Sequence, residues 1–117
     1  MQEAITSLPG WKGNITHKEA EELLISKEAG TYLIRNGDPI TLTVKESLSD
    51  ANKVALDCYI LTIVEENQKI EDIMIVKIQD KWILYHDEPN LIDSSYERFA
   101  SVKDIIKHLK NKAKYPL

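Results

Sequence analysis

Residues 11–35 read WKGNITHKEAEELLISKEAGTYLIR, and this stretch carries the strongest structural signals in the chain. Thr16 and Glu19 have the T-x-x-E spacing of a capping box, which marks the start of a helix. Apolar residues follow the box at helical spacing, so we predict a short amphipathic helix over residues 17–27. The β-branched and aromatic run at residues 31–35 then predicts a strand that ends on an arginine.

The rest of the chain predicts more strands and a second helix. After a turn at residues 36–39, alternating residues predict a strand over 40–44, and residues 45–53 read as a polar loop. Further strands are expected over 56–64, 70–78 and 81–86. A second helix opens at S-x-x-D and places four apolar residues on one face: Val102, Ile105, Ile106 and Leu109.

The predicted order is a helix, a run of antiparallel strands and a second helix. This order favours an α+β fold in which a central antiparallel sheet is flanked by two α-helices. A chain of 117 residues fits one domain. We expect residues 1–10 to be an irregular lead-in and residues 11–117 to form that single domain.

Composition limits the classes of function. The formal net charge is −4, which argues against a nucleic-acid partner, because such proteins present a broad basic face. No apolar run approaches the length of a membrane span, and the first ten residues lack the pattern of a signal peptide. The one cysteine, Cys58, excludes an internal disulfide, so we expect a reducing cytoplasm.

Motifs for catalysis are absent from the sequence. There is no phosphate-binding glycine loop and no dinucleotide fingerprint. Cys58 has no arginine at the close spacing of a cysteine phosphatase loop and lies in an apolar run, as a buried core residue would. The three histidines lack the spacing of metal ligands. We therefore expect no catalytic residue, no cofactor and no metal site.

One group of residues does suggest an anion site. Arg35 ends a strand and runs into Asn36, Gly37 and Asp38, a tight turn whose backbone amides could form an anion-binding nest. His17 lies in the first turn of the first predicted helix, where free N–H groups favour a negative ligand. A guanidinium provides a planar fork that suits a phosphate. An arginine at a strand end is also a common surface residue, so the spacing alone leaves both interpretations open.

The residues at the two ends of the chain resemble those of the Src homology 2 domain. That family opens with a Trp, a Gly and an Ile before an E-A-E-x-L-L helix, and its hallmark strand is G-T-F-L-V-R. Residues 11–24 contain W-x-G-x-I-T-x-x-E-A-E-x-L-L, and residues 30–35 read GTYLIR. Residues 99–108, F-x-S-V-x-x-I-I-x-H, are similar to the family's F-x-S-L-x-x-L-x-x-H helix.

The resemblance implies a non-catalytic module that binds tyrosine-phosphorylated proteins or peptides. It makes Arg35 the arginine that pairs with the phosphate and makes Asn36, Gly37 and Asp38 the phosphate loop. His17 stands where the family's first helix usually supplies an arginine. Gly37 replaces the usual serine, so a hydroxyl ligand is lost and only the amide remains.

The middle of the chain aligns with the family in two ways. In the first, residues 40–44 are the strand after the phosphate loop, Thr41 faces the pocket, and Thr43 belongs to the same site. In the second, residues 59–63 are that strand, and Lys77 would reach the phosphotyrosine. The second alignment needs a phosphate loop of about twenty residues, and long structureless loops are uncommon. We therefore favour the first. In both, the family's histidine beside the ring is missing.

Two departures bear on selectivity and on the rival interpretations. The stretch before the last helix is longer than is usual in the family, and the tail, residues 113–117, is short, so we expect a reduced pocket for residues that flank the phosphotyrosine.

Two alternative functions remain open. One alternative is a domain of the same fold that needs no phosphate; another is a small phosphotyrosine hydrolase that uses Cys58. The Lys-rich, Arg-poor composition would suit a bacterial effector in a host cytosol.

Overall fold

The computed structural model describes residues 5–47, 50–85, 91–92, 97–109 and 112–117. Its elements follow one another as η1 (a 3₁₀ turn, Ile5–Ser7), β1 (Trp11–Gly13), α1 (His17–Leu24), β2 (Thr31–Asn36), β3 (Ile40–Ser47), β4 (Asp50–Leu56), β5 (Cys58–Val64), β6 (Ile70–Ile78), β7 (Lys81–Tyr85), β8 (Leu91–Ile92), α2 (Val102–His108) and β9 (Tyr115–Pro116).

The central sheet has the strand order β1-β2-β5-β6-β7, and β9 also pairs with β2. The pairs β2–β5, β5–β6 and β6–β7 are antiparallel, as predicted. The short strands β1 and β9 run parallel to β2, so the sheet is mixed rather than purely antiparallel. With the two helices, this sheet confirms the predicted α+β fold.

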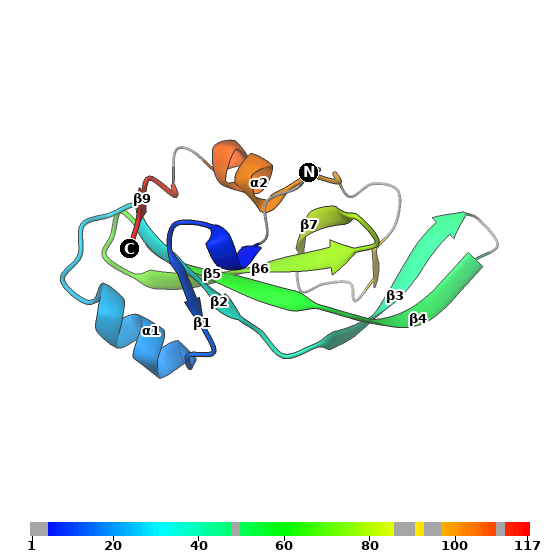
Figure 1. Ribbon diagram of the computed structural model, residues 1–117, viewed down its shortest axis with the longest axis horizontal. Coiled ribbons are helices and arrows are strands. Elements are labelled where there is room, and N and C mark those ends of the chain that lie inside the picture. Colours follow the sequence, from blue (N-terminus) through cyan, green and yellow to red (C-terminus); the bar gives the residue numbers. More distant parts are fainter. Residues whose placement is uncertain (1–4, 48–49, 86–90, 93–96, 110–111) are drawn as a thin grey trace.

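The two faces of the sheet are covered by different helices (Figure 1). Leu33 of β2 packs with Leu24 of α1 and Val64 of β5 in one buried cluster. Its neighbour Ile34 points to the other face and packs with Ile105 of α2 in a second cluster. Successive strand residues point to opposite faces, so Arg35 shares the face of Leu33, which is the face that α1 covers.

The helices form where their capping signals lie. Thr16 and Glu19 make the reciprocal hydrogen bonds of the capping box, and Ser101 caps α2. The first helix ends at Leu24 rather than at residue 27, because the backbone at Ile25 is extended and Ser26 has a φ of 65°. These helices have eight and seven residues, and no helix of the described chain could cross a membrane.

The predicted polar loop at residues 45–53 was wrong. Strand β3 continues to Ser47 and β4 begins at Asp50, so the two strands form a hairpin. It is in register from Ile40↔Leu56 to Val44↔Asn52, and the register shifts before Ser47↔Asp50. Pairing with a partner strand offsets the low β-propensity of individual polar residues. The strand β8 pairs with the other edge of β3, which completes a second sheet that projects beyond the central one (Figure 1).

The first alignment was also wrong, because the strand beside β2 is β5 and not β3. The connection that was expected to be an unfavourable structureless loop is instead mostly the β3–β4 hairpin. At its base, Ile40 and Leu56 pack against Val76 and Ile83 of the central sheet. Burial of each large aliphatic side chain contributes about 1.5–3 kcal/mol, so the base is anchored by a core of its own.

Candidate functional site

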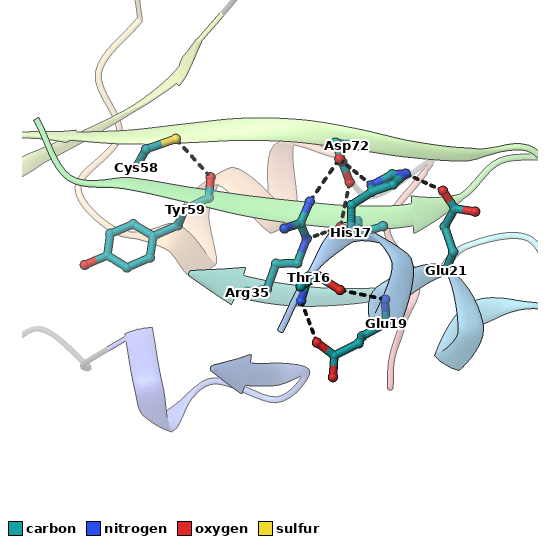
Figure 2. A network of polar contacts seen from close by, with 9 residues as sticks. Thr16, His17, Glu19, Glu21, Arg35, Cys58, Tyr59 and Asp72 are labelled. Carbon is teal, nitrogen blue, oxygen red and sulfur yellow. Dashed lines mark hydrogen bonds and ion pairs between the residues drawn. The ribbon is translucent and has the colours of Figure 1, made fainter. Parts of the chain in front are cut away.

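Arg35 is buried although it is charged. The residue is only 7% exposed, and it lies near the end of β2 on the face that α1 covers. A buried charge is costly unless it is paired and hydrogen-bonded. Figure 2 shows the guanidinium pointing toward Asp72 on β6 and toward the start of α1.

Three side chains from neighbouring strands form a closed set of hydrogen bonds. Arg35 donates from Nε to Thr62 Oγ1 at 3.2 Å and from Nη2 to Asp72 Oδ2 at 3.0 Å. The Thr62 hydroxyl in turn donates to Asp72 Oδ1 at 2.7 Å. The register explains the arrangement, since Thr62 is the cross-strand partner of both Leu33 and Asp72. The set fixes the orientation of the guanidinium.

His17, the first residue of α1, joins this group. Its Nδ1 lies 2.8 Å from Asp72 Oδ2, and its Nε2 contacts Glu21 one helical turn later. The predicted proximity of His17 to Arg35 is therefore found, with Asp72 between them. Both ring nitrogens of His17 therefore face carboxylates.

The turn after β2 differs from the expected anion nest. The amide of Gly37 donates to the carbonyl of Cys58 at 3.0 Å, so this N–H is not free for a phosphate. A Cβ at Gly37 would lie 3.0 Å from that same carbonyl oxygen, so a serine here would require a small shift of the backbone. Asn36 is exposed and donates to Asn14 at 2.7 Å, and Asp38 is exposed.

Three other predicted site residues lie away from Arg35. Thr41 and Thr43 are on β3, where they pair with β4 in the second sheet, and their assignment depended on the alignment that was wrong. Lys77 lies on the opposite face of the central sheet, where its Nζ is 5.4 Å from the centre of the Trp82 ring. The structure does not bring these side chains to the guanidinium.

Thr62 and Asp72 were missed by the sequence analysis. Each lies within a predicted strand, and a charged Asp72 in a strand rich in isoleucine was a signal of a buried partner. The face that each residue takes could be assigned only once β5 was known to be the neighbour of β2.

Cys58 is buried and lies at the start of β5. Burial raises the pKa of its thiol; Arg35 opposes this shift and Asp38 adds to it. The thiol form is therefore favoured, whereas a nucleophile requires the thiolate. Among the residues that the structure describes, no group of three His, Cys, Asp or Glu side chains could hold a metal ion.

Comparison with protein families identifies the family to which this arrangement of strand, helix and arginine belongs. The family model of the SH2 domain matches residues 11–109, which is most of the chain. The chain belongs to the SH2 domain family. Members of this family are non-catalytic modules that bind phosphotyrosine in other proteins, and a guanidinium fixed on the strand after the first helix agrees with that role. No curated protein sequence matches the chain.

Proposed function

We propose that this SH2 domain binds phosphotyrosine through Arg35. The observation that carries the proposal is a guanidinium that is only 7% exposed and is held on its Nε side by Thr62 and Asp72. Within the described part of the chain, Nη1 has no hydrogen-bond partner. The edge formed by Nη1 and Nη2 can therefore receive two phosphate oxygens, and such charge-assisted pairs are strong.

The tyrosine ring would lie beside this edge on an apolar surface. Arg35 is the cross-strand partner of Ile60, and Ile60 is the partner of Met74 on β6. These two side chains share the face of the guanidinium and are partly exposed. They provide aliphatic contact for a ring where the family's histidine is missing.

We further propose that the domain reads phosphotyrosine more than the residues around it. The described tail, residues 113–117, lies beside β2, since the amides of Lys114 and Tyr115 both donate to the carbonyl of Gly30 and β9 pairs with β2. In the described chain, this tail pairs with β2 rather than with β6 or β7. A cavity of about 320 Å³ is lined by residues of β6 and β7 and by Leu109 and Lys112, which follow α2; this volume is near the lower limit for ligand pockets. An array of phosphopeptides with varied flanks tests this; a strong preference at one downstream position would contradict it.

A second candidate function is a protein interaction that needs no phosphate. It is favoured by two observations: Asp72 already pairs with Arg35, and the Gly37 amide is already bonded. Titration with matched phosphorylated and plain peptides separates the two functions, because equal affinities would favour this one.

Residues 11–117 would act as one domain, since β1 and β9, near its two ends, both pair with β2. Its ligand requires tyrosine kinases, so we place the domain in the cytosol of a cell that has them, including a host cell if the protein is a bacterial effector.

The direct test replaces Arg35 with lysine. An ammonium cannot reproduce the fork, so we expect Arg35→Lys to lose at least about tenfold in affinity for a phosphotyrosine peptide. Calorimetry measures the affinity, and Arg98→Lys, a change at the other arginine of the chain, is the matched control. Equal affinities of the native chain and Arg35→Lys would reject the assignment.

A further inference from the structure

Asp72 occupies the position of an anionic ligand in this site. Its Oδ2 receives Arg35 at 3.0 Å and His17 at 2.8 Å, and its Oδ1 receives Thr62 at 2.7 Å. Both carboxylate oxygens are thus used by donors that a phosphate could also use. The carboxylate is the internal counter-ion of the buried guanidinium.

A carboxylate already neutralises the guanidinium before any ligand arrives. Arg35 brings one positive charge, and Asp72, which pairs with it, brings one negative charge. A second carboxylate, that of Glu21, lies on the other side of the His17 ring. A phosphotyrosine phosphate carries about −1.5 to −2 charges at neutral pH. It therefore meets an arginine that is already paired, and the nearest negative charge is the Asp72 carboxylate bonded to that guanidinium. Repulsion between charges a few ångströms apart is substantial at a partly buried position.

Asp72 also has room to leave this position. Its side chain is 30% exposed, whereas that of Arg35 is 8% exposed, so the carboxylate lies on the solvent side of the pair. Asp72 also borders the cavity that β6, β7, Leu109 and Lys112 line. Among the residues that the structure describes, β7 pairs with β6 only from Met74 onward, so none of these strands covers β6 at Asp72 on that side.

We propose that Asp72 is a built-in competitor of the phosphate, which lowers the affinity of the site by holding Arg35 when no ligand is bound. The proposal rests on the proposed function and names the residue that regulates the same site. The phosphate either displaces the Asp72 carboxylate from Arg35 Nη2 or binds beside it and is repelled by its negative charge. In both cases, neutralisation of Asp72 strengthens phosphate binding. A residue that merely oriented Arg35 would have the opposite effect.

The test measures affinity for a phosphotyrosine peptide by calorimetry in Asp72→Asn, which keeps the shape and removes the charge. We expect binding about tenfold tighter than in the native chain. Asp80→Asn, which neutralises an exposed carboxylate in the turn between β6 and β7, should leave the affinity unchanged. Asp72→Ser provides a second neutral variant if the asparagine impairs folding, and it should also bind more tightly.

The outcomes separate the two proposals. If the native chain binds the phosphopeptide and both Asp72 variants bind equally or more weakly, the competitor role is overturned and the proposed function stands. The competitor role is also overturned if Asp80→Asn gains as much as Asp72→Asn, because the effect would then be one of net charge. If neither the native chain nor the Asp72 variants bind the phosphopeptide, both proposals are rejected.

Discussion

Replacement of Thr62 with valine removes one hydroxyl from the centre of the site and keeps the shape of the side chain. Thr62 is fully buried and stands between Arg35 and Asp72. In the variant, Arg35 Nε would be a buried donor without its partner. Asp72 is partly exposed, so water can replace the bond that it loses. The cost therefore comes mainly from the guanidinium.

An unsatisfied buried donor costs about 1–3 kcal/mol. The entropy of unfolding is about 2.1 cal/mol/K per residue, so for 117 residues each 1 kcal/mol lowers Tm by about 4 °C. We expect Thr62→Val to lower Tm by about 4–12 °C, and to weaken phosphopeptide binding because the guanidinium loses one of its two anchors. Thermal unfolding followed by circular dichroism measures the first effect.

Thr62→Ser is the matched control, since it keeps the hydroxyl and removes only a methyl group. It should cost about 1 kcal/mol, in line with the loss of one buried carbon. A valine variant at least as stable as the serine variant would refute the reasoning, because it would mean that the hydroxyl contributes nothing to holding Arg35.

Two further predictions concern stability. The hydrogen bond shared with Glu65, together with burial, raises the pKa of Glu71, so the fold favours the protonated form of this residue. The protonated Glu71 stabilises the fold below its ordinary pKa of 4.5, and this stabilisation is lost as the pH rises through the raised pKa. We therefore expect Glu71→Gln to stabilise the domain at about pH 7 and not at about pH 4. Urea unfolding at the two pH values measures the effect. A gain of the same size at both pH values would contradict this. Gly37→Ala should destabilise the domain by about 1–3 kcal/mol, because its Cβ would press on the Cys58 carbonyl. The control Asp38→Ala changes an exposed neighbour and should be nearly neutral in thermal unfolding followed by circular dichroism. Equal melting temperatures for these two variants would show that the close approach at Gly37 does not matter.

Local signals in the sequence predicted the elements that local chemistry determines. The capping box at Thr16 and Glu19 set the start of α1, and the predicted strand over residues 70–78 has the bounds of β6. The position of Arg35 on a strand after the first helix followed from the same kind of signal. These features depend on neighbours within a few positions along the chain.

Features that depend on pairing between distant segments could not be predicted in this way. Whether β3 or β5 lies beside β2 depends on long-range pairing, and both segments have strand patterns. The wrong choice placed Thr41 in the site and left Thr62 out. The same limit applies to Lys77, whose face could not be assigned until the register of β6 was known.

The hairpin that follows the turn after β2 leaves and rejoins the domain at two residues that face each other, Ile40 and Leu56. Cross-strand partners have Cα atoms about 5 Å apart, so a tight turn could bridge them. Lengthening, trimming or exchanging the intervening residues would thus leave the spacing of the strands on either side untouched. Evolution or an engineer can therefore shorten or replace this hairpin, and among the strand pairs that the structure describes, β8 would then lose its partner β3.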